Sequence, residues 1–486
     1  MTRRWLPYVP SAIAALFVLA VYAFFGSAGT FTFQRVAWDK PYEATGEGYY
    51  GSLAEGFLHG HLHLAHEPDP ILKALHDPYA RAVRDEYQAP YLWDTSFYHG
   101  QYYLYFSALP VLLFYLPFRW LRGGYPLDAL AAVFFCAWAF LVSIATARRA
   151  LRGRKTHIPF ALWVLLIGLG NVIPWTLIHV RTYEVAIACG MAMTATWAYA
   201  LVRFTETGAT RHALLMGVFL ALSIAARPNM LVLLLLMALV IPLRNRRAWV
   251  AFLIPLAITG AAMATYNYAR FGSFTEFGET YQLTGVAMRD YRVCSLCNIP
   301  EAIRLVNNLE HYLAWPPDVH SQFPFVDLQT TRLDQTVSFP GLSEHMAGVG
   351  PINPVVIIGC VIALLLVPRR RVLDAPARGG LRVMSAAWLI MLGLSMCWYV
   401  VARYSLDFMM LMTVATAIVV ESGFDVLQNA GFGVRPLRIA TIALTCYSIV
   451  LCTLLGFMGT QSSFRHLNPA LFEKLSKALT ASKPVR

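Results

Sequence analysis

Long apolar segments recur along this chain, and they constrain its fold more than any other feature. A helix needs about 20 apolar residues to cross the hydrocarbon core of a bilayer. Apolar residues make up 57% of the 486 residues and charged residues only 14%, whereas a soluble domain carries about 25% charged residues. The mean hydropathy is +0.52. We therefore predict an all-α polytopic membrane protein.

Eleven candidate spans can be placed, with Met1 on the inner side and Arg486 on the outer side. They cover residues 6–26, 126–147, 158–178, 183–203, 212–226, 229–243, 248–268, 353–367, 384–402, 405–421 and 439–459. Basic residues accumulate in loops on the cytoplasmic side of a membrane, and this rule supports the arrangement. The predicted inner loops hold Arg3 and Arg4; Arg148, Arg149, Arg152, Arg154 and Lys155; Arg244, Arg246 and Arg247; and Arg369, Arg370, Arg371, Arg378 and Arg382.

The net charge of +12 belongs largely to these short loops. Basic residues there set topology, and no aromatic-and-basic motif for nucleic-acid binding stands out. We therefore predict membrane lipids as partners and exclude nucleic acid.

The spans divide the chain into four parts. Residues 1–268 form a seven-span module with a long outer loop, 27–125. A second outer region covers 269–352, further spans occupy 353–460, and the tail is 461–486. The apolar segment 102–121 is interrupted by two prolines, which remove helix hydrogen bonds. We interpret it as a helical hairpin on the outer leaflet, with a kinked true span as the alternative.

Three smaller features complete the layout. The N-terminal apolar run indicates an uncleaved signal-anchor. Cys294 and Cys297 form a lone Cys-x-x-Cys in the second outer region, for which a disulfide and free thiols both stay open. The tail predicts a capped amphipathic helix that could rest on the membrane surface, with Asn468 as N-cap, Pro469 as first residue, and Leu471, Phe472, Leu475 and Leu479 as its apolar face.

The first outer loop carries Glu47-Gly48-Tyr49-Tyr50 just before a short helix predicted at 52–62. Glycines flank Glu47 on both sides and let the backbone turn sharply. A carboxylate at such a helix entrance can act as a general base or bind a divalent cation, Mg²⁺ or Mn²⁺. Capping of the adjacent helix is the structural alternative.

Asp94 is the second acidic candidate, since it could orient a substrate or a catalytic group. The sequence Asp94-Thr95-Ser96 is also a common turn. A tract of alternating histidines follows the first motif, and such tracts can bind metal; we favour a solvated polar face. Its members are His59, His61, His63 and His66.

Arginines end several spans on the outer side: Arg181, Arg227, Arg270 and Arg403. Arginine is costly near hydrocarbon unless it has an anionic partner, and its planar fork matches a phosphate group. A lipid phosphate would suit several such residues on one face. The alternative for each is topology anchoring or internal pairing, of Arg181 with Glu184 and of Arg403 with Asp407.

The segment Tyr266-Asn267-Tyr268-Ala269-Arg270-Phe271-Gly272-Ser273-Phe274-Thr275-Glu276-Phe277-Gly278 leaves the seventh span on the outer side. Its glycines, aromatic rings and Glu276 suit a loop that stacks on sugar or touches lipid. A structured interfacial turn is the alternative.

With these motifs in order, the chain resembles the GT-C glycosyltransferases, and among them bacterial members of the dolichyl-phosphate-mannose mannosyltransferase type. Glu47-Gly-Tyr49-Tyr50 with Ala54 and Gly60-His61-Leu62 is similar to their first-loop motif. The segment 102–110 resembles the one before their second span. The run 267–278 is the most distinctive match, and Ala402-Arg403-Tyr404 with Asp407 is similar to a late-span signature. Together the matches run from about residue 1 to 410.

The resemblance implies inverting transfer of a sugar from a polyprenyl-phosphate donor to a lipid or glycan acceptor, on the periplasmic face of a bacterial inner membrane. By that resemblance Glu47 is the catalytic acidic residue, with Asp94 as our choice for the second. Arg270, Arg227, Arg403 and Arg181 would bind the donor phosphate, while Tyr49, Tyr50, Tyr103, Tyr105 and Glu276 would contact substrate. Many members have aspartate where this chain has Glu47, so a cation there stays open and no cofactor is certain.

Two other classes of protein compete with the enzyme. A transporter or flippase of lipid-linked sugars should place ionisable residues in the middle of the membrane, often on broken helices. Here the charges gather at span ends, which favours the enzyme. A structural membrane subunit is the third alternative.

Overall fold

The computed structural model describes residues 9–33, 35–36, 48–285, 287–290, 302–331, 344–369, 373–396, 400–459 and 462–480. The longer helices are α1 (Val9–Gly26), α2 (Tyr49–Leu58), α6 (Asp128–Ala150), α7 (Phe160–Leu169), α9 (Thr182–Thr207), α10 (Thr210–Ala226), α12 (Arg246–Phe271), α13 (Ala302–Ala314), α15 (Val355–Leu366), α16 (Ala375–Ser395), α17 (Leu406–Asn429), α18 (Arg435–Leu455) and α20 (Pro469–Leu479). The shorter ones are α3 (Pro70–Ala74), α4 (Arg81–Glu86), η2 (Val111–Tyr115), α5 (Leu116–Arg122), α8 (Ile173–Leu177), η3 (Pro228–Leu233), α11 (Leu234–Val240), η4 (Glu279–Tyr281), η5 (Met288–Asp290), α14 (Val349–Ile352), η8 (Val367–Arg369), η9 (Ala402–Ser405) and α19 (Ser463–Leu467).

Strands are short and pair two by two, always antiparallel. The pairs are β1 (Arg35–Val36) with β4 (Tyr125–Pro126), β2 (Ser96–Tyr98) with β3 (Gln101–Tyr103), β5 (Asp318–Val319) with β6 (Val326–Asp327), and β7 (Gln329–Thr330) with β8 (His345–Met346). The described part of the chain is therefore nearly all-α, as predicted.

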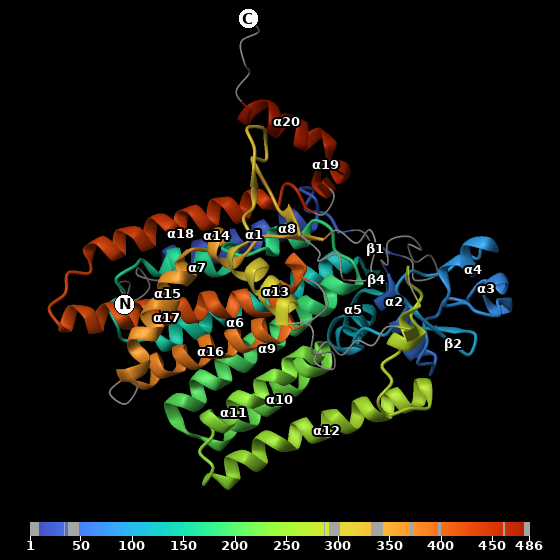
Figure 1. Ribbon diagram of the computed structural model, residues 1–486, viewed down its shortest axis with the longest axis horizontal. Helices are drawn as coiled ribbons and strands as arrows, with labels where there is room; N and C mark the ends of the chain where they lie inside the picture. Colours follow the sequence, from blue (N-terminus) through green and yellow to red (C-terminus); the bar gives the residue numbers. More distant parts are fainter. Residues whose placement is uncertain are drawn as a thin grey trace, which may run out of the picture.

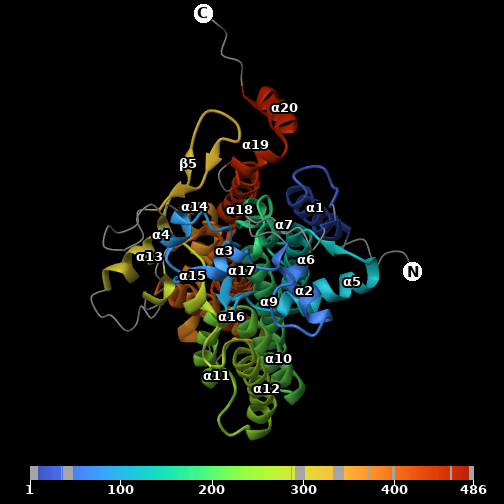
Figure 2. The same ribbon diagram turned by 90° about the vertical axis from the view of Figure 1, so that its right-hand side faces the viewer.

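Long helices run side by side along the long axis of the molecule (Figure 1). α9 and α17 are almost wholly buried among their neighbours, whereas α12 lies at the edge and exposes most of its apolar surface. Seen along that axis, α10, α11 and α12 lie on one side of the bundle and α19 and α20 on the other (Figure 2). Within the described ranges, six helices are long and apolar enough to cross a membrane: α1, α6, α9, α12, α18, and α17 together with η9. These helices support the prediction of a multi-pass membrane protein.

Each predicted span overlaps a helix or a pair of short helices, but several are not single long helices. The span 158–178 is α7 followed by α8, and 229–243 is η3 followed by α11. At the first break the buried Asn171 side chain donates to the Ile167 carbonyl (3.0 Å) and accepts from the Ile173 amide (2.9 Å). The side chain thereby replaces the helix bonds that the break removes. Helix lengths alone do not confirm eleven crossings.

Residues 102–121 do not form the predicted helical hairpin. The segment starts in β3 and continues into one helical stretch, η2 and α5, that ends at Arg122. Pro110 precedes η2, and Pro117 lies inside the stretch where η2 is followed by α5. Proline removes a helix hydrogen bond, and the π-helical turn η2 directly precedes α5. The stretch is about 18 Å long at 1.5 Å per residue, too short to cross about 30 Å of hydrocarbon. Trp120 and Leu121 are 72% and 82% exposed at its end.

Both predicted outer regions meet at one end of the bundle, where α2, α3, α4, the β2–β3 hairpin and η4 gather (Figure 1). We name this the loop-rich end. The Leu283 amide donates to the Thr95 carbonyl (2.8 Å), and the Asp94 amide donates to the Leu283 carbonyl (3.0 Å). The side chain of Arg84 also donates to the Thr284 carbonyl. Residues 278–284 of the second region thus form one layer with the first region.

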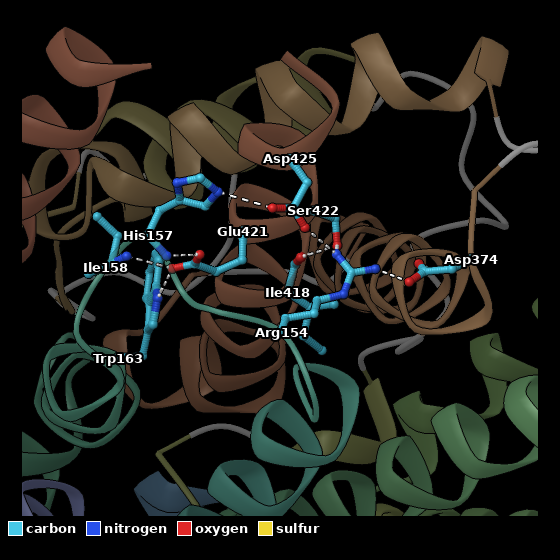
Figure 3. Close-up of polar contacts among 9 residues, drawn as sticks. All are labelled: Arg154, His157, Ile158, Trp163, Asp374, Ile418, Glu421, Ser422 and Asp425. Carbon is cyan, nitrogen blue, oxygen red and sulfur yellow. Dashed lines mark hydrogen bonds and ion pairs between the residues drawn. The ribbon is translucent and has the colours of Figure 1, made fainter. Parts of the chain in front are cut away.

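At the opposite end, carboxylates of α17 bind the connection between α6 and α7 (Figure 3). Glu421 accepts from the backbone amides of His157 (2.6 Å) and Ile158 (2.9 Å) and from the indole N–H of Trp163 (2.8 Å). Asp425 accepts from Arg154 (2.9 Å). We name this the basic end, because it also gathers the arginine-rich connections α6–α7, α9–α10, α11–α12 and α17–α18.

The predicted C-terminal helix is confirmed as α20. The side chain of Asn468 accepts from the Leu471 amide (3.2 Å), and Pro469 is the first residue of the helix. The apolar face lies against protein, since the Phe472 ring packs 5.3 Å from the Phe323 ring. The face that we expected on the membrane surface is thus partly covered by the β5–β6 segment.

Candidate functional site

The acidic motif of the first outer loop is described only from Gly48 onward. Gly48 has a φ of +80°, a left-handed conformation that favours glycine. α2 begins directly after it, at Tyr49, so the predicted short helix exists and starts three residues earlier than expected. Glu47 itself lies outside the described residues.

The two tyrosines of the motif are buried in the loop-rich end. The Tyr49 hydroxyl donates to the Trp93 carbonyl (3.0 Å), which ties α2 to the residue before Asp94. Tyr50 is 0% exposed and its ring stacks on Tyr115 at 5.4 Å. Burial raises the pKa of the Tyr50 hydroxyl well above its ordinary value, while the charge of Arg227 acts to lower that pKa. The Tyr50 hydroxyl has no hydrogen-bond partner among the described residues.

Asp94 accepts hydrogen bonds from side chains in two other parts of the fold. Its backbone has a φ of +58°, a conformation that is uncommon outside glycine. The Tyr183 hydroxyl donates to one carboxylate oxygen (2.6 Å), and the Gln282 amide donates to the other (3.0 Å). Burial raises the pKa of Asp94, while the Tyr183 hydrogen bond and the charge of Arg403 lower it. Strain and a buried carboxyl group together are typical of functional sites.

Arg403 lies beside Tyr183 and between two glutamates. Its guanidinium is 5.2 Å from the centre of the Tyr183 ring, and its nitrogens are 3.8 Å from Glu184 and 3.6 Å from Glu344. The alternative considered from the sequence is internal pairing with Asp407. The structure instead pairs Arg403 with carboxylates from α9 and from the second outer region.

Asp407 is the partner of Arg227. The Arg227 guanidinium donates to the Asp407 carboxylate (2.9 Å), and the Asn229 amide donates to the same oxygen (2.9 Å). The Asp407 side chain is fully buried. The charge of Arg227 is thus already compensated inside the protein.

Arg181 binds a histidine rather than the side-chain pairing with Glu184 that we considered. Its Nε donates to the Nε2 atom of His179 (2.8 Å). Burial first, and then the charge of Arg181, lower the pKa of His179 to about 4. The imidazole is therefore neutral near pH 7 and can accept this hydrogen bond. Glu184 accepts instead from the backbone amide of Arg181 (2.8 Å), as a helix cap.

Arg270 differs from these three arginines in its surroundings. It is 6% exposed, at the last turn of α12. Its guanidinium donates to the Leu104 carbonyl (2.8 Å) and to the Asn267 side chain (2.8 Å), and it lies 4.0 Å from the centre of the Tyr266 ring. Within the described ranges no carboxylate pairs with it, and its Nε has no hydrogen-bond partner.

The remaining predicted contact residues lie around the same layer. Tyr103 packs 5.3 Å from the Phe271 ring, beside Arg270, and Tyr105 packs 3.9 Å from the Phe106 ring. Glu276 accepts from the Gly278 amide (2.6 Å) and from the Thr280 hydroxyl (2.7 Å). Its two oxygens thus hold the turn before η4, as the interfacial-turn alternative expects.

The segment from Tyr103 to Phe106 connects the two halves of this site. The Leu104 carbonyl binds Arg270, and the Phe106 ring packs 5.3 Å from the Tyr183 ring that contacts Asp94 and Arg403. Sequence reasoning missed several members of the site: Tyr183, Glu184 as a partner of Arg403, Asn229, Gln282 and Glu344. Only Glu184 carried a signal, since it stands three residues after Arg181 at a helix start.

A metal at the histidine tract gains no support. Rings of His61 and His63 stack at 4.8 Å. In the part of the chain that the structure describes, no group of three or more histidine, cysteine or acidic side chains could hold a metal ion. Cys294 and Cys297 lie outside the described residues, so both alternatives for this pair stay open.

No protein-family model matches this chain, and a comparison with curated proteins finds no relative. Function is therefore inferred from the residues themselves and from the motif resemblance.

Proposed function

We propose that this chain is an integral-membrane glycosyltransferase of the GT-C type, which transfers a sugar from a polyprenyl-phosphate donor to a lipid or glycan acceptor on the periplasmic face of a bacterial inner membrane. The loop-rich end is then periplasmic and the basic end cytoplasmic. The observation that supports this best is Arg270, a buried cation with no carboxylate partner among the described residues. An uncompensated buried charge costs several kcal/mol, so such a residue suits an anionic ligand.

Neighbouring polar groups without partners strengthen the assignment. The hydroxyls of Tyr50 and Tyr266 and the Nε of Arg270 are all buried and unpaired in the described ranges. Tyr266 lies against Arg270, and the charges of both Tyr266 and Arg227 act on Tyr50. Buried polar atoms are normally hydrogen-bonded, so three unpaired ones near each other suit the oxygens of a phosphate.

In the proposed reaction the acceptor hydroxyl attacks the anomeric carbon of the donor sugar from the side opposite the phosphate. A new carbon–oxygen bond forms, the bond from that carbon to the phosphate oxygen breaks, and polyprenyl phosphate leaves. A carboxylate takes the proton of the hydroxyl. Glu47 holds this role by resemblance, with Asp94 as the second acidic residue. Arg270 stabilises the charge on the departing phosphate.

Transport of a lipid-linked sugar is the alternative. Broken helices at α7–α8 and η3–α11 are a feature of transporters. The side chain at the first break is Asn171, which is neutral and bonded within its own helix pair. The charged partners of α9 and α17 stand at helix ends, at Glu184, Glu206, Asp407, Glu421 and Asp425. This placement favours the enzyme.

Transfer of a labelled sugar from polyprenyl phosphate by purified protein in nanodiscs tests the proposal. Arg270→Ala should weaken donor use roughly 10- to 100-fold, as expected for charge-assisted hydrogen bonds of 1.5–3 kcal/mol. Arg465→Ala, on exposed α19, is the matched control and should act like the parent protein.

Glu47→Gln should abolish transfer while donor binding persists. Equal rates for Arg270→Ala and Arg465→Ala would refute the phosphate site. Movement of intact donor across the bilayer without release of polyprenyl phosphate would favour the transporter.

A further inference from the structure

The basic end carries more positive charge than its own carboxylates can neutralise. The described carboxylates there are Glu206, Asp374, Glu421 and Asp425. Each already has a partner inside the protein. Glu206 accepts from Arg149 (2.9 Å) and Arg203 (2.8 Å).

The other three carboxylates belong to the network of Figure 3. Asp374 caps α16 through the Ala377 amide (3.0 Å) and also binds Arg154. Asp425 binds Arg154 and lies 3.0 Å from the His157 imidazole. Glu421 is occupied by three N–H donors. The Asp374 and Asp425 side chains are partly exposed, but each of the four carboxylates already binds a group of the protein.

Eight exposed cations remain at this end, and none forms an ion pair with a described residue. We name them the basic rim: Arg152, Lys155, Arg211, Arg244, Arg246, Arg247, Arg435 and Arg438. They come from four connections of the chain. Arg152 and Lys155 share a connection with Arg154, while Arg435 and Arg438 open α18, which packs against α7.

Large exposed apolar side chains stand beside the rim. Leu243 precedes Arg244 and is 77% exposed, Ile439 follows Arg438 and is 58% exposed, and Phe432 is 65% exposed. A soluble anion or an acidic protein would give no reason for such residues beside the arginines. A bilayer does, because the apolar side chains reach the acyl region and the guanidinium groups stay at the head groups.

We propose that the basic rim binds the phosphate head groups of anionic phospholipids in the leaflet at this end of the protein. The inference is independent of the proposed glycosyl transfer, since it uses the opposite end of the molecule. Each basic residue near an anionic surface adds to the attraction, which salt screens. The rim should therefore select phosphatidylglycerol over phosphatidylcholine in the lipid shell of the protein.

Retention of lipid on the full-length protein tests the proposal. The protein is placed in nanodiscs of equal phosphatidylglycerol and phosphatidylcholine, released into mild detergent, and its retained lipids are counted by native mass spectrometry. We expect phosphatidylglycerol to exceed phosphatidylcholine about fivefold at low salt, and the excess to fall toward equality in 0.5 M salt. Glycerol 3-phosphate, a soluble head group, should not displace the retained lipid, because it lacks acyl chains.

Charge-neutralised variants sharpen the test. The fourfold variant R152Q/K155Q/R435Q/R438Q should lose most of the preference. The control K73Q/R81Q/K474Q/K477Q removes the same amount of positive charge from other exposed sites. This control should keep the preference for phosphatidylglycerol. If the rim variant fails to insert, the salt dependence of the unchanged protein still decides. Two results would overturn the proposal. One is equal retention of the two lipids by the unchanged protein at low salt, and the other is an equal loss of the phosphatidylglycerol preference in the rim variant and in the control.

Discussion

Arg270 and Arg227 carry the same charge in the same layer of the fold, yet only Arg227 lies against a carboxylate. Asp407 is wholly buried beside Arg227, so a ligand that recruited Arg227 would have to leave a buried carboxylate uncompensated, at a cost of several kcal/mol. Arg270 makes its contacts with neutral groups, a carbonyl, an amide and aromatic rings. The charge of Glu276 acts on Arg270, but the two form no ion pair in the described ranges. An anion could bind Arg270 without breaking an internal ion pair. At the scale of single residues, the surroundings of a cation therefore matter more than its position at a span end.

The pH dependence of transfer should report on Asp94. Tyr183→Phe removes a hydrogen bond that lowers the pKa of the Asp94 carboxyl group, which burial already raises. The pKa of Asp94 should then rise further. If Asp94 acts as a carboxylate, the acid limb of kcat/KM should move to higher pH by roughly one to two units, the equivalent of one charged hydrogen bond.

Loss of the Tyr183 hydrogen bond should also change how the free energy of unfolding depends on pH. A carboxyl group with a raised pKa contributes stability that is full at low pH and is lost as pH rises through the folded-state pKa. Thermal unfolding of Tyr183→Phe should thus show a larger loss between pH 4 and 7 than that of the parent protein. Tyr87→Phe, at an exposed tyrosine, is the control. An unchanged pH profile in Tyr183→Phe would show that Asp94 does not titrate in the reaction.

Residue identity alone predicted several members of this site but not their partners. Asp94, Arg227, Arg270 and Arg403 were recognisable because charge is rare in this chain; the three arginines also stood at span ends, and Asp94 lay in the first outer loop. Their partners come from sequence positions more than 150 residues away in the case of Asp407 and Arg227. Tyr183 and Gln282 carry no pattern of their own. Only the fold brings them to Asp94, so no local rule could have found them.

α17 is held at both of its ends by carboxylates. Asp407 binds Arg227 in its first turn, and Glu421 and Asp425 bind the α6–α7 connection near its last turns. Glu421 lies 14 residues after Asp407, about 21 Å along the helix at 1.5 Å per residue. α17 is the buried centre of the bundle. The contacts at its two ends therefore fix the position of α17 along its axis relative to the neighbouring helices.

Glu421→Ala should destabilise the bundle while leaving the proposed site intact. The side chain is 2% exposed and accepts from three N–H groups, which would lose their acceptor. Unsatisfied buried donors cost about 1–3 kcal/mol each, and we expect about 3 kcal/mol in total because water can reach part of the gap. Thermal unfolding in detergent measures this loss. Glu473→Ala, on exposed α20, should change the midpoint little. A Glu421→Ala protein as stable as that control would contradict the role of the network.

Hydropathy predicted the positions of the helices better than the places where they are interrupted. Every predicted span overlaps helix, because apolar segments of that length have few other stable forms in lipid. The breaks in 158–178 and 229–243 were not predicted, since they depend on distant groups. The Asn353 side chain, for example, donates to the Gly170 carbonyl at the first break (2.8 Å). The strand and helix in 102–121 likewise depend on pairing with Ser96–Tyr98, which apolar content does not reveal.

The two ends of the molecule differ in their charged residues. The loop-rich end holds Arg270, Arg403 and Asp94, and the basic end holds the carboxylate network of Figure 3 together with the basic rim. Residues 92–103 and 278–284 pair as one layer, so neither region is expected to hold its form without the other.

Arg84 offers the sharpest test of that joint layer. It is 1% exposed, and its guanidinium donates to the carbonyls of Pro78 (2.6 Å) and Tyr79 (2.9 Å) in the first region and of Thr284 in the second. Arg84→Met keeps much of the volume and removes all three bonds. We expect the two regions to separate locally, because the three carbonyls would lose their donor in a buried setting.

Hydrogen exchange followed by mass spectrometry distinguishes this local loss from general unfolding. In Arg84→Met, amides of 92–98 and 279–285 should exchange at least tenfold faster, equivalent to about 1.4 kcal/mol of local stability. Amides of α9 and α17 should stay protected, since their packing does not involve Arg84. Arg81→Met, whose partner Asp85 lies on the same exposed helix turn, is the matched control. Faster exchange in α4 alone would mean that Arg84 supports only the first region, and the two outer regions would then be independent units.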